Sequence, residues 1–128
     1  MKKAVVFSPD APKAIGPYSQ ALSFGELVFC SGQLGVDTAT GKLAQGVDAQ
    51  THAAMKNLGA VLAAAGLGYQ DILKTTIFVT DLKDFAAVNQ AYGSYFASEP
   101  PARACVQVAA LPLGGLVEVE CVAARQAD

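Results

Sequence analysis

The sequence has 128 residues, of which 52% are hydrophobic and 16% charged, and its formal net charge is −2. A chain of this length buries enough surface to form a core without metals or disulfides, so we expect a single domain over residues 1–128. The nine lysines and arginines are scattered, so there is no basic patch and we expect no nucleic-acid partner. The few charges leave much apolar surface, which favours an oligomer whose subunits cover it.

The three cysteines argue against both a metal site and a disulfide framework. The sequence has an odd number of cysteines, Cys30, Cys105 and Cys121, and their spacing fits no zinc site. We therefore expect reduced thiols in a cytoplasmic protein without a bound metal. The basic and apolar start of the chain is interrupted at Ser8, which leaves it too short for a signal peptide. The apolar run at residues 58–67 is too short to span a membrane, so we expect no membrane partner.

The first predicted elements are three strands, at residues 2–7, 18–24 and 27–31, where β-prone residues cluster. Residues 25–26 predict a two-residue hairpin turn, with glycine in the first position as a type II′ turn prefers. Residues 32–46 carry polar turn residues and are expected to form a loop.

Two helices are predicted, each from an apolar stripe at helical spacing. The first spans residues 48–65 and stops at Gly66, which suits the position after a helix end. The second spans residues 84–97, with Asp81 or Asp84 as its N-cap. The stripes consist of Ala54, Leu58, Val61, Leu62 and Ala65 in the first helix, and of Phe85, Val88, Tyr92 and Phe96 in the second.

Between the helices, the β-branched run at residues 72–80 predicts a central strand. Two further strands, at 103–109 and 116–124, complete the order βββαβαββ, and residues 111–115 suit a hairpin loop between them. The pattern predicts an α/β (α+β) domain in which both helices pack on one face of a mixed sheet. A partner subunit is the expected cover for the other face.

Arg103 and two glutamates are the first candidates for chemistry. Two prolines stiffen the chain before Arg103, whose guanidinium suits a carboxylate, although an ordinary surface arginine fits the same position. Glu118 and Glu120 alternate with apolar residues and so share one face of a strand, where a carboxylate acts as a general base or is merely solvated. If the last two strands form an antiparallel hairpin, that face coincides with the face of Arg103 and Cys105.

Tyr18, Ser31 and Gly32 are candidates because of their local context. Tyr18 begins a strand after a rigid Gly-Pro turn, where its hydroxyl either binds a ligand or anchors the turn. Ser31 and Gly32 lie at a strand end, where glycine permits a close approach of a ligand or simply leads into a loop.

Three other positions have ordinary structural interpretations. The single histidine, His52, has no partner at triad spacing and is expected at the surface or the edge of the core. Asn89 lies beside the stripe of the second helix and is expected to be solvated. Cys105 is either a reactive thiol or, more commonly, a small buried hydrophobe.

Several motifs in one order resemble the RidA (reactive intermediate deaminase, YjgF-type) family over nearly the whole chain. The most specific is Pro101-Ala-Arg103, followed fifteen residues later by Glu118. The other matching blocks are residues 15–20 (IGPYSQ), 31–33 (SGQ), 74–82 (KTTIFVTDL), 85–89, Cys105 and 111–118. The link at residues 96–101 is shorter than in many relatives, which leaves substrate size open.

The resemblance implies a chorismate mutase-like fold and a homotrimer with a central barrel-like core and clefts between subunits. It implies that Arg103 binds the substrate carboxylate, that Glu118 activates water and that Tyr18 assists. Supporting positions fall on Ser31, Gly32, Asn89 and Cys105. The implied reaction is hydrolysis of 2-aminoacrylate and 2-iminobutanoate to 2-oxo acids and ammonia, without metal or organic cofactor. Three alternatives stay open: a trimer that only senses small carboxylates, a ribonuclease or translation inhibitor, and a chaperone-like surface, which the apolar composition permits.

Overall fold

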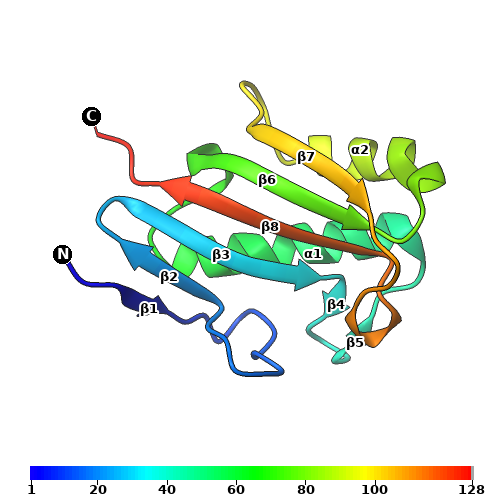
Figure 1. The fold of residues 1–128 in the computed structure, drawn as a ribbon, viewed down its shortest axis with the longest axis horizontal. Coiled ribbons are helices and arrows are strands. Elements are labelled where there is room, and N and C mark those ends of the chain that lie inside the picture. The colour runs from blue at the N-terminus through cyan, green and yellow to red at the C-terminus, as the bar shows by residue number, and fades with distance from the viewer. Residues whose placement is uncertain (128) are drawn as a thin grey trace.

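The computed structural model describes residues 1–127 and contains a six-stranded mixed sheet (Figure 1). The strands lie in the order β1-β2-β3-β8-β6-β7, and only β6 and β7 run parallel. Their bounds are β1 Ala4–Val6, β2 Ala21–Phe24, β3 Leu27–Leu34, β6 Ile72–Val79, β7 Ala102–Gln107 and β8 Val117–Ala124. A separate ribbon of β4 (Val36–Asp37) and β5 (Lys42–Leu43) follows β3.

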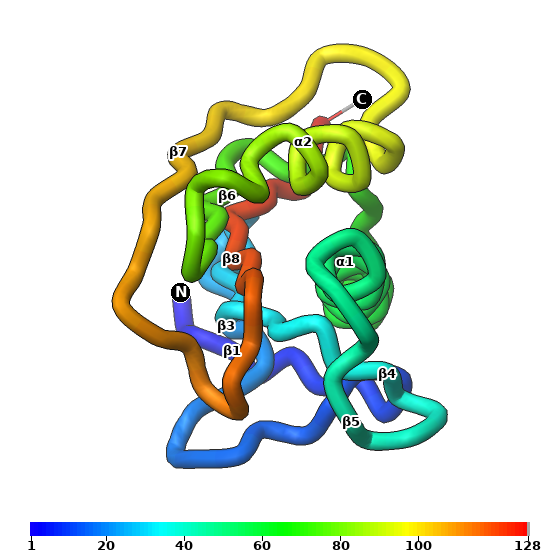
Figure 2. Tube along the Cα trace, turned by 90° about the vertical axis from the view of Figure 1, so that its right-hand side faces the viewer, coloured from blue at the N-terminus to red at the C-terminus, as the bar shows by residue number. Residues whose placement is uncertain are grey.

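The two helices, α1 (Gly46–Ala64) and α2 (Phe85–Gly93), pack on the same face of the sheet, as predicted (Figures 1 and 2). All five residues of the predicted α1 stripe are buried in the core between helix and sheet. Gly66 ends α1 with a φ of 77°, and the N–H groups of Gly66 and Leu67 donate to the carbonyls of Ala63 and Leu62, both at 2.9 Å. This hydrogen-bond pattern is a Schellman motif, which satisfies the last carbonyls of the helix.

The predicted turn at residues 25–26 is confirmed. Gly25 has a φ of 61°, and Phe24 pairs with Leu27 across the turn. A positive φ at the first turn position is what a tight hairpin requires when it joins strands of right-handed twist.

Three boundary predictions are wrong. The strand predicted over residues 18–24 begins only at Ala21, so Tyr18 lies in the loop before it. The predicted loop at residues 32–46 contains the end of β3 and the β4–β5 ribbon. The second helix ends at Gly93 because Gly and Ser are poor helix formers, and the chain continues in tighter turns through Tyr95 and Phe96. Asp81 caps the short turn before α2, accepting from the Lys83 N–H at 2.9 Å, whereas the Asp84 side chain makes no capping bond.

The predicted hairpin between the last two strands is also wrong, because β6 lies between them (Figure 1). The connection from β6 through α2 is a β-α-β crossover, which places β7 parallel to β6 on one edge. The other edge of β6 then accepts β8 in an antiparallel pair.

This pairing separates the candidate residues onto two faces of the sheet. Arg103 pairs with Thr75, which is fully buried on the helix side, and so faces the helices. Glu118 pairs with Phe78, three residues further along the same strand, and so faces the opposite, open side. The expectation that Arg103 and Glu118 share one face within the chain is therefore corrected.

The open face of the sheet carries large apolar side chains that no helix covers. Those that are substantially exposed are Val5, Phe24, Leu27, Phe29 and Val106. Exposed apolar patches of this kind mark interaction surfaces, and a cover by another subunit stays a prediction.

Candidate active site

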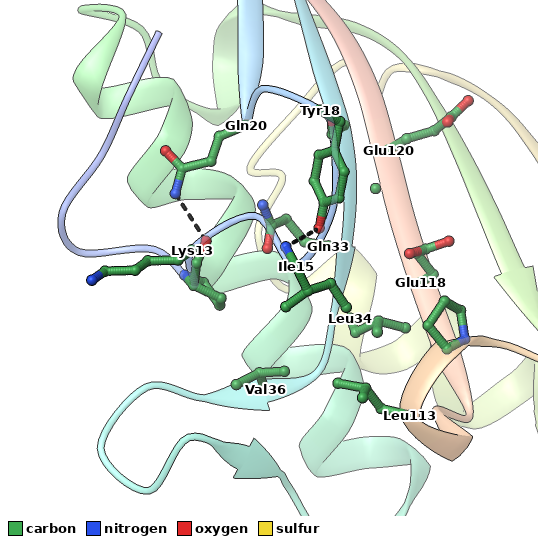
Figure 3. A pocket seen from close by; sticks show the side chains of 14 residues that line it. Lys13, Ile15, Tyr18, Gln20, Gln33, Leu34, Val36, Leu113, Glu118 and Glu120 are labelled. Carbon is green, nitrogen blue, oxygen red and sulfur yellow. Dashed lines mark hydrogen bonds between the residues drawn. The ribbon is translucent and has the colours of Figure 1, made fainter.

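A cleft of about 400 Å³ lies where the N-terminal loop, β3 and the start of β8 meet (Figure 3). It brings together four of the seven predicted site residues, namely Tyr18, Ser31, Gly32 and Glu118. The remaining lining residues are Pro12, Lys13, Ile15, Gln20, Gln33, Leu34, Val36, Pro112, Leu113 and Glu120.

A bulge in β3 positions Glu118 in this cleft. The register between β3 and β8 shifts between Cys30 and Gln33, so Ser31 and Gly32 together lie opposite Glu120. A Cβ atom on Gly32 would lie 2.8 Å from the Cδ atom of Glu118, closer than such atoms normally approach. The glycine is therefore what leaves space for the carboxyl group.

The surroundings of Glu118 raise its affinity for a proton. Burial is the main cause that raises the pKa of Glu118 above its ordinary value, and the neighbouring carboxyl of Glu120 adds to it. A carboxylate with a raised pKa is a stronger base than a solvated one. Glu118 is thus suited to accept a proton from a water molecule.

Hydrogen bonds around β3 hold Tyr18 at the edge of the cleft. The Ser31 hydroxyl donates to the Ser19 carbonyl at 2.6 Å, and the Ile15 N–H donates to the Tyr18 hydroxyl oxygen at 3.2 Å. Because Tyr18 accepts in that bond, its own O–H proton stays available for a ligand. Tyr18 is 47% exposed, so a ligand in the cleft can reach it.

The other three predicted residues gather at α2 and β7. The Arg103 Nη1 atom donates to the Asn89 Oδ1 atom at 2.6 Å. The guanidinium carbon lies 5.5 Å from the ring centre of Phe85 and 5.3 Å from that of Tyr92. These contacts hold an exposed cation in place through hydrogen bonding and cation–π attraction. Asn89, expected to be solvated, is instead the partner of Arg103.

Cys105 is partly buried and packs against the core, next to Ile77 in β6. Burial raises the pKa of its thiol, and the positive charge of Arg103 opposes that effect only in part. At neutral pH the group is therefore mainly a thiol, which is a weak nucleophile.

The cleft lacks a cation directed at Glu118. Of its lining residues only Lys13 is positively charged, and Figure 3 shows its ammonium group pointing away from Glu118. The cleft holds a carboxyl group and a hydroxyl, whereas the group at α2 and β7 holds an exposed cation.

Several cleft residues were missed in the sequence analysis. Gln20 is buried and joins the N-terminal loop, accepting from the Ser8 N–H at 2.7 Å and donating to the Pro12 carbonyl at 2.9 Å. Ile15 and Leu113 are apolar residues within loops, and this unusual placement was the available signal.

His52 lies at the edge of the core, as predicted, with its Nδ1 atom 2.9 Å from the Tyr95 hydroxyl. Among residues 1–127 no three His, Cys, Asp or Glu side chains gather as a metal site would require. Within the same residues, no helix is long and apolar enough to cross a membrane.

Comparison with known proteins gives consistent matches. The family model described as Endoribonuclease L-PSP matches residues 8–125. Protein DfrA of Myxococcus xanthus is 52% identical over 126 residues, which cover 96% of each chain. Reactive Intermediate Deaminase A, chloroplastic, of Arabidopsis thaliana is 48% identical over 124 residues, which cover 96% of this chain and 66% of that protein.

A third relative and a solved structure agree with these matches. The 2-iminobutanoate/2-iminopropanoate deaminase of Capra hircus is 45% identical over 124 residues, covering 96% of this chain and 90% of that protein. The crystal structure of E. coli TdcF with bound serine superposes with a TM-score of 0.93 at 41% identity, covering 96% of this chain and 99% of that one.

Proposed function

The chain belongs to the RidA family, and from this premise we propose that it is a hydrolytic deaminase of reactive imines and enamines. Its substrates are 2-iminobutanoate and 2-aminoacrylate, which it converts to 2-oxo acids and ammonia. The observation that carries the proposal is Glu118, a half-buried carboxyl with a raised pKa in a cleft that the Tyr18 hydroxyl also lines. The names of the deaminase relatives support the same kind of reaction.

The proposed site is completed by a second copy of the chain within a homotrimer. Arg103 and Glu118 lie on opposite faces of the sheet, so one copy does not direct both at one small molecule. Arg103 is exposed at the β7 edge, and the open face offers the apolar surface that a subunit contact buries. We assign Arg103, Asn89 and Cys105 of one copy to the same site as Tyr18, Ser31, Gly32 and Glu118 of the next.

In the proposed mechanism, Arg103 binds the substrate carboxylate while Asn89 fixes the guanidinium. A hydrogen bond of this charged kind is worth about 1.5–3 kcal/mol net. Glu118 accepts a proton from water as the water oxygen bonds to the imine carbon, and the C=N electrons move to nitrogen, which is protonated. Tyr18 holds the substrate through its hydroxyl.

The resulting carbinolamine then breaks down to products. Glu118 passes the proton taken from water to the nitrogen, and the carbinolamine hydroxyl then gives its own proton through Glu118 to the same nitrogen. The C–N bond breaks, and ammonia leaves while the C=O bond forms. One imine and one water thus give one 2-oxo acid and one ammonia. 2-Aminoacrylate first becomes the imine by taking up a proton at its methylene carbon and losing one from its nitrogen. Because such imines also decay in water, general base help of about 10²–10⁴-fold is sufficient.

The test is a coupled assay. A pyridoxal-phosphate-dependent threonine dehydratase generates 2-iminobutanoate from threonine, and 2-oxobutanoate formation is followed with and without the protein. We expect acceleration by the wild type and none by Arg103→Ala, with the oligomer intact in size-exclusion chromatography. A fully active Arg103→Ala variant would refute the site assignment.

The same assay separates the other candidate functions. Carboxylate binding without acceleration indicates a sensor. Salt-dependent RNA binding or cleavage indicates the activity after which the family model is named. The single histidine bound to Tyr95 and the net charge of −2 do not favour ribonuclease chemistry. The reduced thiols of Cys30, Cys105 and Cys121 suit a cytoplasmic location, which we also propose.

A further inference from the structure

Leu113 has a backbone conformation that leucine rarely adopts. Its φ is 62° and its ψ is 11°, in the left-handed region that favours glycine. Among residues 1–127 only Glu99 is another non-glycine residue with positive φ. Strained residues of this kind are typical of functional sites, where the surrounding structure maintains them.

The turn around Leu113 is held by its neighbours. The Gly115 N–H donates to the Pro112 carbonyl at 3.1 Å, and the Gly114 N–H donates to the Leu111 carbonyl at 3.3 Å. Gly115 is buried against Leu34, since a Cβ atom at Gly115 would lie 2.9 Å from the Leu34 Cδ2 atom. The strained backbone is therefore part of an ordered turn.

Core packing does not explain why a leucine occupies this position. The Leu113 residue is 63% exposed, so its burial within the chain offsets little of the conformational cost. Its side chain projects from the loop into the cleft, towards Leu34 and Val36 and on the same side as Ile15 (Figure 3). Together these four residues form an apolar wall beside Glu118.

We infer that Leu113 is a specificity-determining residue that contacts the aliphatic side chain of the imino acid substrate. The inference rests on the proposed function and extends it to a substrate class, imines with aliphatic side chains longer than the ethyl group of 2-iminobutanoate. The cleft of about 400 Å³ exceeds the needs of the smallest imino acids. An apolar pocket typically changes kcat/KM by roughly 10–200-fold for each methylene that it accommodates.

The experiment compares two imines in parallel. An L-amino-acid oxidase generates the imines of alanine and of leucine, and the deaminase accelerates their hydrolysis to the 2-oxo acids. We expect a higher kcat/KM of the wild type for the leucine imine. Leu113→Ala is expected to lower the leucine-to-alanine ratio of kcat/KM about 10-fold, mainly through KM, while the alanine value changes less than about 3-fold.

Two further variants test whether the Leu113 side chain itself causes the selectivity. Leu113→Gly keeps the left-handed backbone accessible, so it should lose the same selectivity without a lower thermal midpoint. Leu73→Ala removes a leucine that is also substantially exposed, at 51%, but lies outside the cleft, and should leave the ratio unchanged.

The outcomes distinguish the inference from the proposed function. No acceleration of either imine by the wild type overturns the proposed function itself. Acceleration of both imines with an unchanged ratio in Leu113→Ala overturns only the role of Leu113. Loss of the oligomer in Leu113→Ala by size-exclusion chromatography also overturns it, since Leu113 would then be a subunit contact.

Discussion

The cleft and the α2–β7 edge hold their functional residues in different ways. In the cleft, a bulge and a glycine leave space for Glu118, which is half-buried there and has a raised pKa. At the edge, Arg103 is exposed and is held by one hydrogen bond and two aromatic rings. In the proposed function, the cleft supplies proton transfer and the edge supplies charge recognition, so turnover of an anionic substrate requires both regions.

The largest expected effect tests whether the two regions act across subunits. Arg103→Ala and Glu118→Gln should each lose at least ~10²-fold in turnover. Co-expressed in one trimer, they should recover about a third of wild-type activity, since one of the three sites in a mixed trimer combines an intact arginine from one copy with an intact glutamate from the next. Activity is measured in the coupled dehydratase assay on the co-purified oligomer.

The control for this experiment is co-expression of two differently tagged copies that both carry Glu118→Gln. These mixed oligomers should stay inactive. If the Arg103→Ala and Glu118→Gln mixture also stays inactive although both copies co-purify, the site lies within one chain.

A smaller effect is expected when a cleft residue other than Glu118 is substituted. Gly32→Ala places a methyl group where the Glu118 side chain lies, and this flexible side chain must move. Turnover should fall by about 10–100-fold because the base is displaced, while the thermal midpoint changes little. Gly93→Ala, which has open space at its Cβ position, is the matched control and should be fully active.

Substitutions at the α2–β7 edge should change KM more than kcat. Asn89→Ala removes the acceptor for Arg103, and we expect KM to rise by about 5–10-fold with kcat largely kept. Asn89→Asp should be worse, because its carboxylate competes with the substrate for the guanidinium. Gln90→Ala, at the exposed neighbouring position, is the control. Equal kcat losses in the two Asn89 variants would contradict a binding role.

The smallest effect is on stability and follows from the pKa of Glu118. Because burial raises this pKa in the folded state, the ionised carboxyl destabilises the fold at pH values above the folded-state pKa. At pH values below the pKa of Glu118 in the unfolded state, this carboxyl is protonated in both the folded and the unfolded state, so the destabilisation disappears. Glu118→Gln should therefore raise the thermal midpoint near neutral pH and not at about pH 3, well below the ordinary Glu value.

The exposed Glu26 provides the control for this measurement. Glu26→Gln should show no pH-dependent gain in the same thermal scans. A gain for Glu118→Gln that is equal at both pH values would contradict burial of the charge as its cause.

The elements that depend on local periodicity could be predicted from the sequence alone. The apolar stripe of α1, the stop at Gly66, the turn at Gly25 and the alternation of Glu118 with valines all follow from neighbours within a few residues. Motif resemblance also indicated the family and which residues to examine. The pairing of Arg103 with Asn89 was not predictable, because α2 and β7 approach each other only in the fold.

The face of the sheet on which each of these residues lies, and the residues that it contacts, follow only from the tertiary structure. A strand such as β8 can pair with any free edge of a sheet. Because the crossover through α2 places β7 on one edge of β6, the other edge of β6 pairs with β8. That choice placed Arg103 and Glu118 on opposite faces of the sheet. Likewise, the need for a glycine at position 32 arises from the close approach of Glu118, which is distant in sequence. Periodicity specifies which side of a strand a residue occupies, and long-range packing determines what lies there.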